Sequence, residues 1–307
     1  MQSIEETKPK RQDWWRHHLP ELLLAIAIII FIGGIGFLAS LRQANFLSSR
    51  FDLGLMDQVV WNTAHGRLLQ LTDPDGVATI SRLTIHADIF LALLAPLYWI
   101  YSSPYTLIAL QTVILALGAL PLYRLGCLVL KNRPLALTIA ISYLAFPLMQ
   151  RADLFDFHAV TLSTTFLLFA FYYAYTKQYW RFGLLSVLTM TTKETMPFLI
   201  IMLGIYILWT KRNRWVGLGT ILISAAWFYV LLWWVMPGAR GGSTHFALSY
   251  YSQFGATPIQ IITTLVIKPW TWIRDLLTFK TYSYLHYFVL PTFLFSLFSP
   301  LIILLAI

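Results

Sequence analysis

The chain has 307 residues and a formal charge of +9, and 58% of its residues are hydrophobic while only 11% are charged. A soluble domain carries about 25% charged residues, so the composition excludes a soluble globular enzyme, a disordered chain and a disulfide scaffold. The excess basic residues are scattered between apolar runs, as membrane orientation requires. We therefore predict an all-α, multi-pass integral membrane protein, a helical bundle that contacts membrane lipids and no nucleic acid.

The first predicted span is the uncharged run of residues 22–41, which follows a basic N-terminal tail, residues 1–21. A spanning helix needs about 20 apolar residues, and the apolar core of a signal peptide is shorter. The run therefore predicts a retained helix with a cytoplasmic tail. Residues 42–104 form a predicted outer loop with interfacial helices, in which Gly66 ends a helix and Asp73–Gly76 forms a turn.

The basic residues place the remaining spans. Residues 89–101 are predicted not to cross, because one more crossing would put the basic loop 124–133 outside. A helical hairpin is predicted over residues 182–210, with its apex at Thr192–Thr195. The other predicted crossings are residues 105–124, 134–150, 160–176 and 215–235 and the run from Tyr284. Residues 237–282 form a predicted outer, partly interfacial segment. The result is a single transmembrane domain, residues 22–307, of about eight spans, with 12 Lys or Arg on the inner face. Because the chain ends within an apolar run, we expect its C-terminus to be incomplete.

Nine of the 13 acidic residues fall on the predicted outer face. Solvated loop acids are the plain alternative, but charges beside membrane segments are costly unless they are paired or functional. This favours a carboxylate-lined outer cavity, to which Asp52, Asp156 and Lys193 would converge from separate segments. Asp52 and Asp57 lie about 140° apart on a helix, so only one of them would face the cavity.

Three further groups have two interpretations each. Asp153, Asp156 and His158 have a spacing that suits a divalent metal, or they cap the helix that starts near residue 160. Lys193–Glu194 is an ion pair that eases insertion, or Lys193 offers a cation to a phosphate. The loop Pro237–His245, with Arg240, is a plain linker or a phosphate cradle. The sequence contains no nucleotide-binding fingerprint, CxxC or HExxH motif, so nucleotide cofactors are not supported.

Two features of the first outer loop resemble the GT-C superfamily of membrane glycosyltransferases, which includes protein O-mannosyltransferases and the aminoarabinose transferase. Phe51–Asp52, followed by Ala64–Gly66, resembles the acidic motif of that superfamily. His86 with Pro96–Trp99 resembles its interfacial His-Pro-Pro-Leu-Tyr stretch. Leu53 is a departure, because the superfamily has Glu at this position.

Other motifs resemble more closely a GT-C-like bacterial membrane family of unknown function, common in cyanobacteria and actinobacteria. They are Phe51–Gly54, Asp57–Gln58, Trp61–Thr63, Asp156–His158 and Lys193–Glu194. This resemblance covers nearly the whole chain.

The GT-C resemblance implies an enzyme that transfers a sugar from a polyprenyl-phosphate donor on the outer face of the bacterial inner membrane. It implies these roles: Asp52 as the general base and Asp57 as a second catalytic candidate; Lys193, Glu194, Arg240 and His86 around the donor phosphate; and Asp153, Asp156 and His158 around a divalent metal. A transporter or flippase of a lipid-linked or small substrate is the alternative, as is a non-catalytic GT-C-like protein. Acids gathered on one face, without repeated halves, favour the enzyme.

Overall fold

The computed structural model describes residues 11–241, 251–278 and 281–283, and the chain divides into two compact units. Unit 1 comprises residues 1–80 and 88–193, and unit 2 comprises residues 81–87 and 194–307. The predicted crossing from Tyr284, the first ten residues of the tail and the end of the basic loop at residues 242–245 lie outside the described residues.

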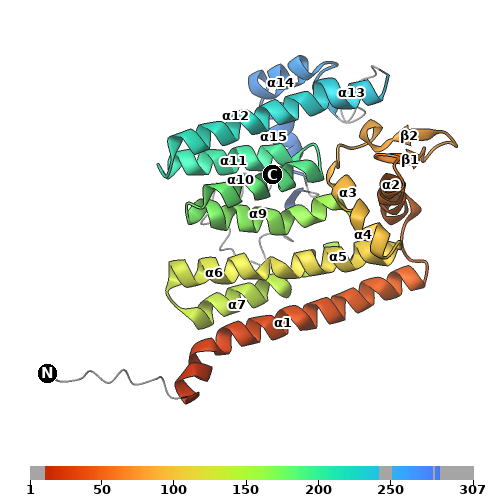
Figure 1. Ribbon diagram of the computed structural model, residues 1–307. Coiled ribbons are helices and arrows are strands. Elements are labelled where there is room, and N and C mark those ends of the chain that lie inside the picture. Colours follow the sequence, from red (N-terminus) through yellow and green to blue (C-terminus); the bar gives the residue numbers. More distant parts are fainter. Residues whose placement is uncertain (1–10, 242–250, 279–280, 284–307) are drawn as a thin grey trace. The chain divides into compact units, whose positions relative to one another are not determined.

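Long apolar helices form the body of unit 1 (Figure 1). They are α1 (Arg11–Ala44), α5 (Pro104–Leu117), α6 (Ala119–Leu130), α7 (Arg133–Leu144), α8 (Pro147–Leu154), α9 (Ala159–Tyr175) and α10 (Tyr179–Thr192). Helix α1 packs against α5, α7 and α8, and α9 packs against α10. Leu24, Phe31 and Leu115 belong to a buried apolar cluster shared by α1, α5, α6 and α7.

Small residues bring α6 and α7 close together. A Cβ atom added to Gly126 would lie 2.8 Å from the Cβ of Ala136, so no larger side chain fits there without movement. Helices in a membrane gain packing in this way, because lipid provides no hydrophobic force between them. The turn between them begins at Lys131 in the left-handed conformation, and Asn132 caps α7 by accepting a hydrogen bond from the Leu135 N–H.

The apolar helices agree with several of the predicted crossings. Among the described residues, three helices are long and apolar enough to span a membrane, namely His18–Ala44, Pro104–Leu130 and Arg214–Ala239. The pair α7–α8, bent by 42°, makes a fourth if it counts as one span. Helices α9 and α11 are apolar but shorter, so the structure supports a helical membrane protein, and the count of eight spans stays a prediction.

The predicted first outer loop folds into short elements. They are η1 (Arg50–Gly54), α2 (Leu55–Ala64), β1 (Gln70–Thr72), β2 (Thr79–Ser81), α3 (Phe90–Leu93) and α4 (Ala95–Ile100). The predicted helix stop is confirmed, because Gly66 follows α2 with a φ of +81°. The predicted turn is confirmed too, since the Gly76 N–H donates to the Asp73 carbonyl. The strand pair β1–β2 was not predicted.

The apolar stretch Phe90–Ile100 is too short to cross a bilayer. It consists of α3, with four residues, and α4, with six, which join at Leu94. At 1.5 Å per residue it measures about 16 Å, against about 30 Å for the hydrocarbon core. This length supports the predicted non-crossing segment, and the placement of the later loops stays a prediction.

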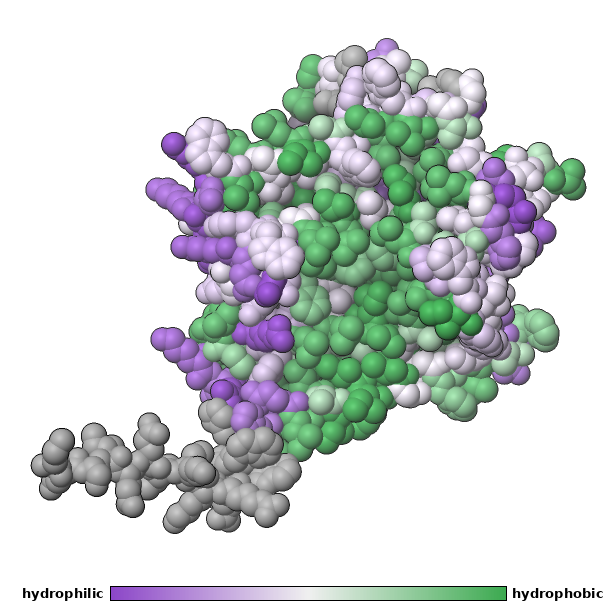
Figure 2. Space-filling model, viewed as in Figure 1, coloured by the Kyte–Doolittle hydropathy of each residue, from purple (hydrophilic) through white to green (hydrophobic). Residues whose placement is uncertain are grey.

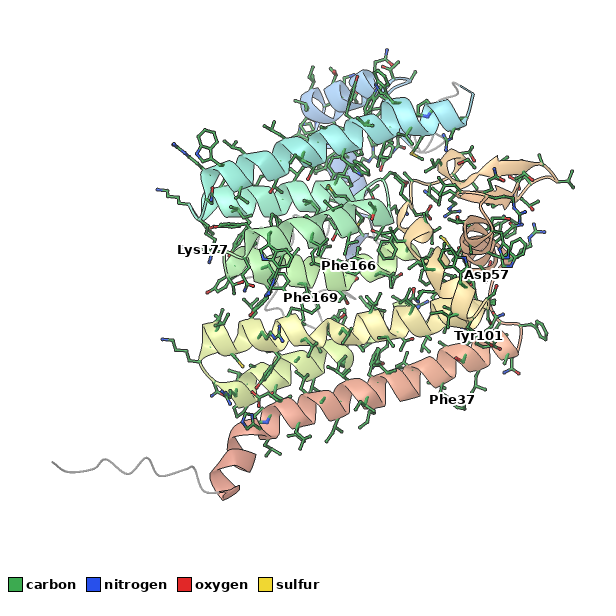
Figure 3. The ribbon with its side chains drawn as sticks, in the orientation of Figure 1. Phe37, Asp57, Tyr101, Phe166, Phe169 and Lys177 are labelled. Carbon is green, nitrogen blue, oxygen red and sulfur yellow. The ribbon has the colours of Figure 1, made fainter. Side chains whose placement is uncertain are left out.

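The two ends of unit 1 carry the groups that the topology assigns to opposite membrane faces. Asp57 lies at the end of the helices where the first outer loop folds, and Lys177 lies at the other end (Figure 3). Apolar side chains cover the outward-facing middle of α1 and α5, whereas hydrophilic side chains gather over the α6–α7 turn and over β1–β2 (Figure 2). This distribution along the helices is what a spanning bundle requires.

Unit 2 contains a second helical layer. Its described elements are η2 (Arg82–Thr84), α11 (Met196–Trp209), α12 (Arg214–Val230), η3 (Leu231–Val235), α13 (Met236–Ala239), α14 (Pro258–Ile267) and α15 (Trp270–Leu276). Helices α11 and α12 pack closely at Gly204 and Gly217, because a Cβ added to either would lie 3.0 Å from the other's carbonyl oxygen. Helix α13 packs against η2.

Candidate functional site

An acid and an imidazole from distant parts of the sequence meet in unit 1. Asp52 lies in η1, and His158 is the residue that precedes α9. Nε2 of His158 lies 3.1 Å from Oδ1 of Asp52. Both side chains are about one-third exposed, at 28% and 32% respectively, so solvent and a ligand can reach the pair. The ring of Phe155 stacks on His158, with centroids 5.8 Å apart.

Both ring nitrogens of His158 lie within hydrogen-bond distance of an oxygen atom. Nδ1 lies 3.0 Å from the backbone oxygen of Asp156, which can only accept, so Nδ1 must carry a proton. Nε2 faces a carboxylate oxygen of Asp52, and two lone pairs would repel each other there. A proton on Nε2 therefore makes this contact a hydrogen bond from His158 to Asp52.

Asp156 positions the backbone from which Asp52 projects. Its Oδ2 accepts a hydrogen bond of 2.6 Å from the Ser49 N–H, and its side chain is 4% exposed. The hydroxyl of Ser49 in turn accepts from the Phe51 N–H and caps η1. A charged acceptor makes a stronger bond to a backbone N–H than a neutral one does. Asp156 thus ties the start of η1 to the segment that precedes α9.

A buried amide on α5 holds the Asp153–His158 segment from the other side. Gln111 is 1% exposed; its Oε1 accepts from the His158 N–H at 3.0 Å, and its Nε2 donates to the Asp153 carbonyl at 3.3 Å. The neighbouring Thr112 donates to Oδ1 of Asp153 at 3.1 Å. The other oxygen of that carboxylate, Oδ2, is buried and accepts no hydrogen bond from the described residues.

Asp57, the second catalytic candidate, is engaged elsewhere. The hydroxyl of Tyr98 on α4 donates a short hydrogen bond to Oδ1 of Asp57 on α2. Burial raises the pKa of Asp57, and the bond from Tyr98 opposes that rise. Among the described residues no hydrogen bond joins Asp57 to Asp52; Asp57 joins α2 to α4 through Tyr98, and its catalytic role stays a prediction.

Two of the predicted phosphate-binding residues form a buried pair in unit 2. Oε1 of Glu194 lies 2.9 Å from Nδ1 of His86, and Oε2 accepts from the Ala87 N–H at 3.0 Å. Burial raises the pKa of Glu194, but the hydrogen bond and charge of His86 and the backbone N–H outweigh it, and the net pKa falls to about 2. Glu194 is therefore a carboxylate that holds the segment of residues 81–87 against the start of α11.

The remaining two candidates differ from each other. The guanidinium of Arg240 donates through Nε to the Thr84 carbonyl, which makes it part of the same attachment in unit 2. Lys193 is half-buried and follows α10 in an extended conformation. Its side chain makes no hydrogen bond or ion pair with any residue in the described part of the chain. The predicted meeting of Lys193 with Asp52 and Asp156 stays a prediction.

The proposed metal ligands point in different directions. Asp153 faces Thr112, Asp156 faces the Ser49 N–H, and His158 uses both ring nitrogens. Within the ranges that the structure describes, no group of three or more His, Cys, Asp or Glu side chains could hold a metal ion. Metal binding by this trio stays a prediction, and no step proposed below depends on it.

Comparison with protein families gives one finding. The model of the family described as "Predicted membrane protein (DUF2079)" matches residues 42–307. The chain belongs to this family. The match covers the Asp52–His158 pair, the Glu194 attachment and every described helix after α1. Comparison of this DUF2079 member with curated proteins and with solved structures gives no match.

Proposed function

We propose that this DUF2079 member is a membrane glycosyltransferase of GT-C type, which transfers a sugar from a polyprenyl-phosphate donor to an acceptor on the outer face. The observation that carries the proposal is the 3.1 Å contact between Asp52 and His158. A carboxylate that is about one-third exposed and oriented by an imidazole, beside a membrane, is suited to activate a hydroxyl group. The basic loops on the other face support a cytoplasmic N-terminus in the inner membrane.

The chemistry needs one proton acceptor. An acceptor hydroxyl has a pKa far above neutrality, so a positioned base lowers the barrier to its attack. Oδ1 of Asp52 is bonded to His158, while Oδ2 makes no hydrogen bond with a described residue and is available to the acceptor. The hydroxyl oxygen bonds to the anomeric carbon, its proton passes to Asp52, and the bond from the anomeric carbon to the phosphate oxygen breaks. The polyprenyl phosphate leaves with that electron pair.

His158 and Asp156 are positioning residues in this scheme. His158 fixes the plane of the Asp52 carboxylate, and Asp156 fixes the backbone of η1 through the Ser49 N–H. Positioning within a fraction of an ångström matters, because misplacement by about 1 Å costs about 100-fold in rate.

The test is transfer of a radiolabelled sugar from polyprenyl phosphate in reconstituted membranes. Asp52→Asn keeps the size of the side chain but removes its basicity, and we expect the rate to fall by about 10²–10⁴-fold. Asp73→Asn is the matched control, because Asp73 lies in the β1–β2 turn and Asn suits a turn equally well. Equal rates for the wild type and Asp52→Asn would remove Asp52 from the mechanism.

One observation favours a second candidate function, transport of a small or lipid-linked substrate. Oδ2 of Asp153 is buried without a hydrogen-bond donor among the described residues, and Asp153 lies in the bent pair α7–α8. Buried carboxylates on broken helices are typical of coupling-ion sites in transporters. A wild type that transfers no sugar but moves a substrate across vesicles, with Asp153→Asn inactive, would favour this function.

A further inference from the structure

A cavity in unit 1 carries positive charge that the proposed chemistry has not used. It lies between the end of α1 and α8, and its volume is about 520 Å³. The described lining residues are Arg42, Pro147, Gln150, Arg151, Leu154 and Phe155. Two of these six are arginines and none is acidic, while the others are apolar apart from one amide. The volume falls within the range of about 300–1,000 Å³ that small-molecule sites occupy.

The guanidinium groups of Arg42 and Arg151 have N–H donors that make no hydrogen bond to a described residue. Arg42 uses one N–H to reach the Leu47 carbonyl at 3.1 Å. Elsewhere in the described chain, neither Arg42 nor Arg151 has a hydrogen-bond or ion-pair partner for its side chain. A guanidinium carries five N–H donors in a planar fork, which matches the oxygens of a phosphate. Two such groups beside one cavity at a membrane surface predict an anionic ligand with at least two acceptor oxygens.

The apolar walls indicate that this anion carries a hydrocarbon chain. Leu154 and Phe155 line the cavity next to the arginines, and the Phe155 side chain is 52% exposed. A water-soluble phosphate would gain nothing from these walls, whereas a lipid phosphate keeps its charge at the arginines and its chain in the bilayer. Basic pockets beside spanning helices bind lipid head groups in the same way, with the charged group in the pocket and the hydrocarbon chain in the bilayer.

One wall residue of the cavity contacts the Asp52–His158 pair. Phe155 forms part of its wall, and the same ring stacks on His158 with an interplanar angle of 18°. His158 in turn contacts Asp52 at 3.1 Å. Contacts through Phe155 and His158 therefore link the phosphate site at the arginines to the carboxylate of Asp52.

We propose that Arg42 and Arg151 bind the phosphate of a polyprenyl-phosphate lipid in this cavity, with the chain passing along Leu154 and Phe155. The inference rests on the proposed function and identifies a binding site for the sugar donor. It replaces the phosphate role expected of Glu194 and Arg240, which hold residues 81–87 in unit 2. Ordinary phospholipids share the phosphate, so the test must separate them from the polyprenyl lipid.

The experiment measures lipid binding to the full chain in phosphatidylcholine nanodiscs by native mass spectrometry, with polyprenyl phosphate, polyprenol or phosphatidylglycerol as the added probe. We expect polyprenyl phosphate to bind best, and Arg42→Gln or Arg151→Gln to weaken it by about 10- to 100-fold, as the loss of a charged hydrogen bond implies. Arg151→Lys keeps the charge and should recover part of the binding. Arg124→Gln is the matched control, because Arg124 is an exposed arginine on α6 outside the cavity.

Three results would overturn the assignment: unchanged binding by both Gln variants, equal binding of polyprenol, or equal binding of phosphatidylglycerol. Arg151→Lys, which preserves the charge at an exposed position, separates a lost contact from a folding defect. Binding is measured without turnover, so it tests this inference separately from sugar transfer. Intact binding without sugar transfer would therefore contradict the proposed function alone, and sugar transfer without arginine-dependent binding would contradict this inference alone.

Discussion

The Glu194 attachment in unit 2 allows a stability prediction with a worked magnitude. Glu194→Gln keeps the size of the side chain and one oxygen that can accept from the Ala87 N–H, but it removes the negative charge beside His86. The pKa of Glu194 falls from its ordinary 4.5 to about 2 in the folded protein. At 1.36 kcal/mol for each pKa unit, this difference corresponds to about 3 kcal/mol of folding free energy at neutral pH.

The sign of the pH dependence follows from the direction of the shift. Since the folded pKa of Glu194 is depressed, its contribution is fully present above the unfolded pKa of 4.5 and is lost as the pH falls towards about 2. The wild type should therefore lose more stability than the variant between these values. Because the side chain of Glu194 is only 7% exposed, solvent screens this interaction little.

The assay is reversible unfolding of the purified protein in mixed micelles, monitored by helical circular dichroism at about pH 7 and about pH 3. We expect Glu194→Gln to unfold more easily than the wild type by about 3 kcal/mol at the higher pH and by much less at the lower. Asp75→Asn, an exposed acid of the β1–β2 turn, controls for loss of a charge and should differ little at either pH. A difference between the wild type and Glu194→Gln that stays constant with pH would refute the reasoning.

Three further predictions concern unit 1. Gln111→Leu removes the acceptor of the His158 N–H and should lower the free energy of unfolding by about 1–3 kcal/mol in the same assay. Gly126→Leu forces a side chain into the 2.8 Å approach to Ala136 and should destabilise by about 1–3 kcal/mol, which thermal unfolding in detergent would measure. Ser102→Cys, exposed after α4, should react with an impermeant reagent added outside intact cells, in a background without the native cysteine. Reaction from the cytoplasmic side alone would contradict the topology.

Much of the helical layout follows from the sequence, because its signals are long and local. Uncharged runs of about 20 residues and basic loops are typical of spans and of their inner ends. They predict the helix of residues 22–41, the break at Thr192–Thr195 and the short segment at residues 89–101. Strand pair β1–β2 lacks such a signal, since each strand has only three residues and β1 packs against α2, which precedes it in the chain.

The candidate site is harder to predict, because its hydrogen bonds join residues far apart in the sequence. Asp52 and His158 were both candidates, but nothing in the sequence shows that they pair across 106 positions. Gln111 was missed, although an amide within an uncharged apolar run is costly in a membrane without partners and is therefore a usable signal. The backbone N–H of Ser49 carries no sequence signal at all. Of the acids expected to line one cavity, Asp52 contacts His158, Asp57 contacts Tyr98 and Glu194 contacts His86, and their sharing of a cavity stays a prediction.

Leu53 occupies the position at which the GT-C motif that this loop resembles has Glu. The side chain of Leu53 is 2% exposed, so the residue after Asp52 faces the packed interior of the loop. A carboxylate there would be buried without water, which costs several kcal/mol unless a partner neutralises it. Asp52 instead has His158 as its polar neighbour, at 3.1 Å. The departure at Leu53 therefore leaves the surroundings of Asp52 polar. The proposed mechanism therefore predicts that His158→Ala lowers the rate of sugar transfer. Leu53→Glu should lower the free energy of unfolding without raising that rate.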